Sequence, residues 1–181
     1  MTRAFPEVVP VLPGDGLTLR EMTEADVPAW FERASDPESS ALSGDPIPES
    51  IEICYGWLET HRRNFTERTS IRWAIVPDGT DRSIGSIGIS NISTDGRVAE
   101  IGAVIARSYW NRGIVTRATG CVVEYSMVRL GLEEIRAETL CTNLAAIRVL
   151  ERLGFRLDRT IADYRNTDTM KQDGHLYVYR G

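Results

Sequence analysis

Short runs in which apolar and polar residues alternate predict about seven β-strands. Leu17 and Leu19 alternate with Thr18 and Arg20, which is typical of a half-buried strand. The later strand-like runs are IRWAIV (71–76), SIGSIGISNI (83–92), VAEIGAVIA (98–106), EIRAETL (134–140), FRLDRTI (155–161) and HLYVYR (175–180). The turn sequences PDGTD and STDGR join the central runs, so we expect those strands to be antiparallel.

Apolar residues that recur every three or four positions predict four helices. In the first, Thr23 is a good N-cap, and Val27, Trp30 and Phe31 form one apolar face. The other predicted helices cover residues 50–68, 113–130 and 143–154, the last with Asn143 as its N-cap. Two polar segments, 36–50 and 162–174, are rich in turn-forming residues and predict loops.

The order of these elements predicts a mixed α+β fold in one domain spanning residues 1–181. The strand–helix–strand unit from Ala99 to Leu140 needs a crossover, so its two strands are expected to be parallel neighbours. We therefore expect a mostly antiparallel sheet of about seven strands with one parallel pair, flanked by four helices.

Composition and charge exclude several classes of protein. The formal net charge of −5 argues against nucleic-acid binding, although it suits an amine-bearing partner. No run approaches the ~20 apolar residues of a membrane span, and the start of the chain lacks a signal-peptide pattern, so we expect a soluble cytoplasmic protein without a membrane partner. Three widely spaced cysteines and two histidines predict neither a disulfide framework nor a metal site.

The stretch SYWNRGIVTRATG (108–120) is a tight, basic turn from a strand into a helix. The first N–H groups of a helix have no internal partner, so such a turn can bind an anion through its backbone. The donors here would be the amides of Asn111 to Thr116, with Gly113 allowing unusual dihedral angles and Arg112 adding charge. A phosphate or pyrophosphate is the natural ligand, although many turns of this kind bind nothing. Neither GxxxxGK[ST] nor GxGxxG is present.

Three motifs in this order and spacing resemble the GNAT family of acetyl-CoA-dependent N-acetyltransferases, most closely its RimJ/RimL-like ribosomal-protein N-terminal acetyltransferases. They are LTLREMTEAD (17–26), AEIGAVIARSYWNRGIVTRA (99–118) and TNLAAIRVLERLGF (142–155). The resemblance covers nearly the whole chain. It implies the acyl-CoA N-acyltransferase fold, in which the parallel strands splay apart, and acetyl-CoA as cosubstrate.

The resemblance also implies the residues that hold acetyl-CoA. The pyrophosphate loop of the family matches at Gly113, whereas Asn111 and Val115 replace its usual Gly and Ala. The strands 100–106 and 135–140 would flank the pantetheine arm, and Asn143 would bond it. Ala146 replaces a serine of the subgroup, and Leu150 stands where other members carry a general-acid tyrosine. The implied cofactor-binding set is Ala103, Val104, Ile105, Asn111, Arg112, Gly113, Ile114, Val115, Thr116, Asn143 and Ala146.

Acetyl transfer by direct attack in a ternary complex needs a proton acceptor for the amine and a donor for the developing oxyanion. Glu100 is the candidate base, directly or through water, with a surface ion pair as the alternative reading. Tyr164 is the candidate acid or acceptor-site residue. Cys141 as a nucleophile ranks lower because no histidine is near it in sequence, and His175 is read as structural.

We therefore predict an acetyl-CoA-dependent N-acetyltransferase acting on a primary amine: a protein N-terminus, a polyamine, an aminoglycoside or another small amine. The acceptor is expected between the first two helices and the segment 162–173. A non-catalytic acyl-CoA-binding sensor or interaction module is the main alternative, and a nucleotide-binding protein is a third. The chain could be a monomer or a homodimer paired through an exposed C-terminal strand.

Overall fold

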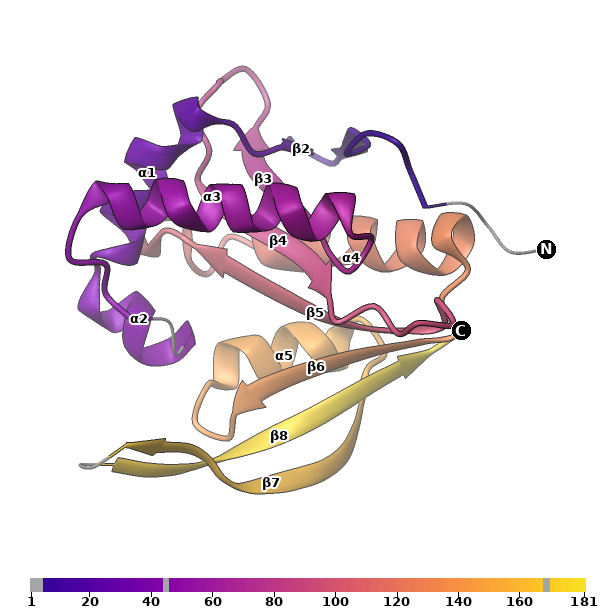
Figure 1. The fold of residues 1–181 in the computed structure, drawn as a ribbon. Helices are drawn as coiled ribbons and strands as arrows, with labels where there is room; N and C mark the ends of the chain where they lie inside the picture. Colours follow the sequence, from indigo (N-terminus) through magenta and orange to yellow (C-terminus); the bar gives the residue numbers. More distant parts are fainter. Residues whose placement is uncertain (1–4, 44–45, 168–169) are drawn as a thin grey trace.

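The computed structural model describes residues 5–43, 46–167 and 170–181. Its strands are β1 Leu12–Gly14, β2 Leu17–Glu21, β3 Ile71–Pro77, β4 Gly85–Ser90, β5 Val98–Ile105, β6 Glu134–Leu140, β7 Arg156–Thr167 and β8 Met170–Arg180. Its helices are α1 Val27–Ala34, α2 Pro37–Ser43, α3 Ile51–Thr66, α4 Ile114–Tyr125 and α5 Leu144–Arg152 (Figure 1). Helix α4 runs on into a π-helical turn, Ser126–Leu130, which ends at Gly131 in a left-handed conformation.

The strands form one sheet in the order β1-β2-β3-β4-β5-β6-β8-β7. Every neighbouring pair is antiparallel except β5 and β6, as the crossover predicted. The parallel pairing joins Val98–Glu100 to Glu134–Arg136 and stops there. Beyond it the two strands diverge (Figure 1), each still paired to its outer neighbour, β4 or β8. The expected mixed fold with a splayed parallel pair is confirmed.

Helices cover both faces of the sheet. On one face, α4 buries Ala118 and Val122 against sheet residues such as Trp73 and Ile101. On the other face, the α1–α3 side, a second cluster contains Val27, Cys54, Leu58, Ala74 and Val76, with Trp30 and Trp57 packed against it. Among the residues described, no helix is long and apolar enough to cross a membrane.

The loop predicted for residues 36–50 is wrong in its first half, where the short helix α2 forms. Asp36 caps this helix, since its Oδ1 accepts hydrogen bonds from the amides of Glu38 (3.0 Å) and Ser39 (2.9 Å). Pro37 then occupies the first helical position, where a missing N–H costs nothing. The same Pro and Ser residues that signal a loop also begin helices, and the segment is too short to show an apolar period.

The loop predicted for residues 162–174 is also wrong where the structure describes it, because 162–167 belong to β7 and 170–174 to β8, which pair as antiparallel strands; residues 168 and 169 lie outside the described part. This hairpin lies at the edge of the sheet, so its polar sequence needs no apolar face. The register shifts between Ile161 and Arg165, where Asp163 has φ +49°. Tyr164 therefore lies on a strand. Strand β1 is a further element that the sequence pattern did not predict.

A partly buried ion pair between Arg20 and Asp26 holds the start of the first predicted helix. Asp26 is 2% exposed and accepts hydrogen bonds from Arg20 at 2.8 and 2.9 Å and from the Thr23 amide at 2.8 Å. Burial alone would raise the pKa of Asp26, but the bonds from Arg20 and Thr23 outweigh it and leave that pKa below its usual value. The pair thereby fixes the start of α1 to strand β2.

We predict that Asp26→Asn lowers the free energy of unfolding by about 2 kcal/mol, since it leaves Arg20 without its charge partner on a side chain that is partly solvated. The contribution of Asp26 is present above pH 4 and is lost as the pH falls through its lowered pKa. Denaturant titration at neutral pH measures the change. The control is Asp158→Asn at an exposed ion pair with Arg159, for which we expect a change within about 0.5 kcal/mol. Equal effects of both variants would contradict the assignment.

Candidate functional site

The turn before α4 contains two residues in the left-handed conformation, and one of them is Gly113, where the sequence allows unusual dihedral angles. Asn111 has φ +60° and Gly113 has φ +69°, both left-handed, and Gly113 is the N-cap of α4. The indole Nε1 of Trp110 donates to the carbonyl of Ile105 at 3.0 Å and holds the turn against the end of β5. No side chain caps this helix, so its first N–H groups are left for a ligand.

The three arginines near this turn contact different partners. Arg112 lies over the ring of Tyr109, with its guanidinium carbon 5.3 Å from the ring centroid. Arg107 pairs instead with Asp36 and Glu38 beside α2, at 3.4 and 2.5 Å. Arg117 donates to the carbonyls of Asp15 and Arg112. Arg112 is therefore the arginine placed to add charge at the turn, and Arg107 ties the turn to α2.

All of the residues predicted to hold the cofactor surround one cavity of about 370 Å³, here called the loop cavity. They are Ala103, Val104, Ile105, Asn111, Arg112, Gly113, Ile114, Val115, Thr116, Asn143 and Ala146. Leu42 and Ser43 of α2 close it from the other side. The structure brings these residues together because β5, α4 and α5 meet where the parallel strands separate.

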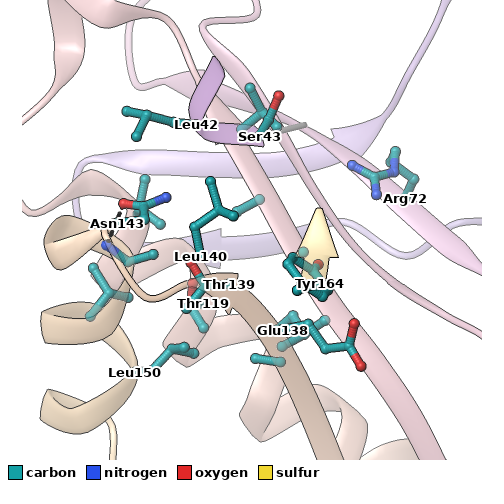
Figure 2. Close-up of a pocket in the computed structure, with 18 residues that line it drawn as sticks. Leu42, Ser43, Arg72, Thr119, Glu138, Thr139, Leu140, Asn143, Leu150 and Tyr164 are labelled. Carbon is teal, nitrogen blue, oxygen red and sulfur yellow. Dashed lines mark hydrogen bonds between the residues drawn. The ribbon is translucent and has the colours of Figure 1, made fainter. Parts of the chain in front are cut away.

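A second cavity, the splay cavity, occupies about 270 Å³ between the diverging ends of β5 and β6. Gly102 lines it from β5 and Leu140 from β6, with Leu150 of α5 at one side and Tyr164 of β7 at the other (Figure 2). Because the pairing of β5 with β6 ends at Glu100, the backbone groups of 101–105 that point away from β4 have no partner strand among the described residues. The wall of the splay cavity is thus partly made of backbone donors and acceptors.

A third cavity, the acceptor cavity, occupies about 290 Å³ between helices α1 to α3 and the sheet. Trp30 of α1 and Trp57 and His61 of α3 form one wall, while Arg72 lines the sheet side and the splay cavity as well. Ser43 and Val104 line all three cavities. This is the place between the first two predicted helices where an acceptor was expected.

The candidate bases differ in their distance from the splay cavity. Glu100 does not line it, and its carboxylate accepts a hydrogen bond from Asn91 at 2.9 Å. It does project from the same sheet face as Gly102, two residues further along β5, which does line the cavity. Glu138 of β6 lines the cavity directly, and Figure 2 shows it beside Tyr164. Sequence reasoning missed Glu138. Its polar position in the alternating run EIRAETL was the signal that could have found it, because this position lies on the face of the strand opposite to the apolar residues.

Helix α5 presents its N-terminus and one side to the cavities. Asn143 caps the helix, with its Oδ1 accepting from the amide of Ala146 at 3.1 Å. The expected N-cap is confirmed, and its amide nitrogen remains the part able to meet a ligand. Ala146 and Leu150 both line the splay cavity, so two of the positions at which this chain departs from the family pattern face the same space.

Cys141 and His175 are brought together, which sequence reasoning missed. Cys141 Sγ lies 3.4 Å from His175 Nδ1, and Thr160 Oγ1 lies 3.3 Å from the same nitrogen. Their contact joins β8 to the end of β6. The antiparallel pairing of these two strands cannot be predicted from a local sequence pattern. Neither residue lines the loop, splay or acceptor cavity, so the pair does not face the proposed reaction space.

Two basic side chains that line the acceptor cavity, His61 and Arg33, have lowered pKa values. Burial, and next the charge of Arg72, lowers the pKa of His61 to about 4. The same two causes lower the pKa of Arg33 to about 10. At neutral pH His61 is therefore a neutral ring, while Arg33 keeps its charge.

We predict that His61 titrates near pH 4 in NMR spectra of its ring, and that Arg72→Gln raises this pKa by removing a neighbouring positive charge. Unfolded His61 binds its proton near pH 6.5, so the free energy of unfolding falls as the pH drops from about 6.5 to about 4, by at most about 1.4 kcal/mol per unit. Arg97→Gln, at an exposed pair with Glu133, is the control and leaves the pKa unchanged. Titration of wild-type His61 near 6.5 would show that the ring is not buried as described.

Comparison with known proteins identifies the family. The acetyltransferase (GNAT) domain model matches residues 16–156. The N-acetyltransferase YoaA of Bacillus subtilis is 32% identical over 168 residues, which cover 93% of this chain and 95% of YoaA. The N-acetyltransferase p20 of Bacillus licheniformis is 25% identical over 89% of this chain and 90% of its own length. Neither relative has an assigned acceptor in its name.

Solved structures share the fold at low identity. The ribosomal L7/L12 α-N-protein acetyltransferase RimL, in complex with coenzyme A, superposes with a TM-score of 0.85. The two sequences are 16% identical, and the match covers 94% of this chain and 98% of that one. Spermidine N-acetyltransferase from Vibrio cholerae, in complex with CoA and spermine, gives a TM-score of 0.81 at 18% identity over 91% of this chain and 95% of that one. With the family model covering most of the sequence, the chain belongs to the GNAT acetyltransferase family.

Proposed function

We propose that the protein is an acetyl-CoA-dependent N-acetyltransferase that acetylates a primary amine by direct attack in a ternary complex. The observation that carries this proposal is the junction of the three cavities at Ser43 and Val104. Such a junction lets a cofactor enter from the loop side and an acceptor from the α1–α3 side, and brings both to the splay cavity.

The loop cavity fits the cosubstrate. The left-handed Gly113 opens the uncapped amides of α4 to a pyrophosphate, and Arg112 adds a positive charge nearby. Among the described residues, the backbone of Ala103 and the amide N–H of Ile105 have no partner strand on the β6 side, so an extended arm can bond them as a strand bonds its neighbour. Val115 lines the cavity without closing it. RimL and the Vibrio cholerae spermidine enzyme, both similar in fold, were solved with coenzyme A.

The reaction assigns each proton a place. The amine nitrogen attacks the thioester carbonyl, the C–S bond breaks, and the nitrogen gives up one proton. We assign that proton to Glu100 through a water, since its carboxylate shares the sheet face that leads to the splay cavity. Tyr164 lines this cavity and is our candidate donor to the leaving thiolate, in place of the tyrosine that Leu150 replaces.

The acceptor is a protein N-terminus or a small amine, in the manner of the RimJ/RimL-like subgroup, whose members RimL and RimJ share this fold. We further propose a cytoplasmic protein, acting as a monomer or as a homodimer. Strand β7 ends the sheet and leaves an edge at which a second chain can pair.

A non-catalytic acyl-CoA-binding module is the second candidate function. It is favoured by Ala146 and Leu150, which place apolar groups at two positions of the splay cavity where the family pattern has polar ones. Release of free thiol from acetyl-CoA in the presence of a panel of amines separates the two functions, because the module binds acetyl-CoA and releases none.

We predict that acetyl-CoA binds the wild type at micromolar strength in calorimetry and that Gly113→Glu weakens binding at least a hundredfold. The glutamate adds a side chain and a negative charge where the pyrophosphate would sit. Any side chain at φ +69° is also strained, so the control is Gly79→Glu, at φ +78° in the exposed β3–β4 turn with nothing near its Cβ. The control carries the same strain and charge and should bind normally. A folded wild type that binds no acetyl-CoA would end the proposal.

We predict that Glu100→Gln lowers kcat roughly ten- to a hundredfold, because it removes the proton acceptor. Glu138→Gln is the matched variant, a carboxylate on the neighbouring strand, and should leave kcat nearly unchanged. The reverse result would move the base to Glu138. Binding of acetyl-CoA by both variants shows that the loop cavity is intact.

A further inference from the structure

Two buried polar groups on the acceptor cavity lack partners. Arg33 of α1 is 4% exposed, and neither Nη1 nor Nη2 has a hydrogen-bond acceptor among the described residues. The hydroxyl of Ser39 on α2, a residue 5% exposed, has no partner there either. Both residues line the acceptor cavity. Buried polar groups are nearly always hydrogen-bonded, and a buried charge without a partner is costly. Two such groups on one cavity indicate that their acceptor comes from a ligand inside it.

The charge around this cavity is positive. Arg33 and Arg72 both line it, and its described lining contains no carboxylate. Among the described residues, the carboxylate whose charge acts on Arg33 is Asp26, and its oxygens already accept hydrogen bonds from Arg20 and Thr23. The described residues therefore supply no further anion to Arg33.

Aromatic rings also line the cavity. Trp30 stacks on His61 with ring centroids 5.5 Å apart and an angle of 13°, and contacts Trp57 at 5.6 Å. With His61 neutral, the three rings form an aromatic, weakly polar surface. A ligand that fills the cavity therefore has an apolar part beside its anion, and a volume of about 290 Å³ suits a small molecule.

The residues shared with the splay cavity indicate where the reacting group of an acceptor would lie. Val104 and Ser43 open it to the splay cavity, where acetyl transfer is proposed, whereas Arg33 projects from α1. An acceptor whose amine lies at the junction can extend its anion toward Arg33.

We propose that the acceptor is a small primary amine that carries a carboxylate, bound with the carboxylate against Arg33 and its apolar part against Trp30 and Trp57. This inference rests on the proposed function and narrows its substrate class. The planar fork of an arginine matches a carboxylate with two parallel hydrogen bonds. Polyamines and aminoglycosides are disfavoured, since the buried charge of Arg33 repels their additional cationic groups.

The test compares ligands that differ in the carboxylate alone. Binding of L-phenylalanine, L-phenylalaninamide and phenethylamine is measured by calorimetry without acetyl-CoA, with spermidine as the cationic comparison. We expect L-phenylalanine to bind at least tenfold more tightly than its amide, and spermidine to bind weakest. Equal binding of the acid and the amide, or preference for spermidine, overturns the inference.

A second pair identifies the source of the carboxylate. The peptides Ala-Asp-amide and Ala-Asn-amide carry the same N-terminal amine and differ in one acidic side chain. Discrimination in the amino-acid pair supports a small acceptor. Discrimination in the peptide pair alone overturns that assignment in favour of an acidic protein N-terminus.

Arg33→Met tests the residue itself. We expect it to reduce L-phenylalanine binding to the level of the amide, to leave amide binding unchanged, and to raise Tm because a buried charge without a partner is removed. Arg82→Met is the control, at an exposed arginine that pairs with Glu32. Equal weakening of the acid and the amide by Arg33→Met overturns the inference. If this variant does not fold, the ligand pairs with the wild type still decide.

The two proposals can fail separately. If the carboxylate is preferred but acetyl-CoA is not bound, the proposed function is wrong and the carboxylate site remains. If acetyl transfer occurs with no preference for carboxylated amines, the proposed function stands and this inference is wrong.

Discussion

The early end of pairing between β5 and β6 is the constraint on which the rest of the structure depends. Up to Glu100 and Arg136 the two strands pair with each other. Beyond these residues each strand is paired with its outer neighbour alone. The gap stays open because β4 and β8 fix both sides of it. It exposes main-chain groups that a continuous sheet would have satisfied, and such groups call for a partner. The cavities, the helix ends and the candidate catalytic groups are all arranged around this gap.

The two helices that meet at the gap begin in different ways. Helix α5 satisfies its own N-terminus through Asn143, whereas α4 begins at a left-handed glycine with no side-chain cap. Both are preceded by short turns from the strands that flank the gap. The difference assigns them different tasks: α5 supplies a side wall, and α4 supplies unsatisfied donors at the positive end of its dipole.

Local patterns in the sequence predicted what local forces determine. The turn at Asn111 and Gly113, the cap at Asn143 and the crossover between parallel strands were all legible, because neighbouring residues decide them. Helix α2 was not predicted because the residues that begin it, from Asp36 onward, are also typical of loops. The contact of Cys141 with His175 and the buried Arg33 were out of reach, since each depends on residues distant in sequence that the fold brings together. The roles of Glu100 and Tyr164 stay predictions.

Helix α2 belongs to both halves of the site. Arg107 ties it to the turn before α4, while its Ser43 borders the space on both sides of the junction. A ligand that shifts this short helix on one side alters the room available on the other. The affinities of the two sides are then thermodynamically linked: whatever factor one ligand imposes on the second, the second imposes on the first. In that case α2, a seven-residue helix whose sequence pattern predicted a loop, would couple the two binding equilibria.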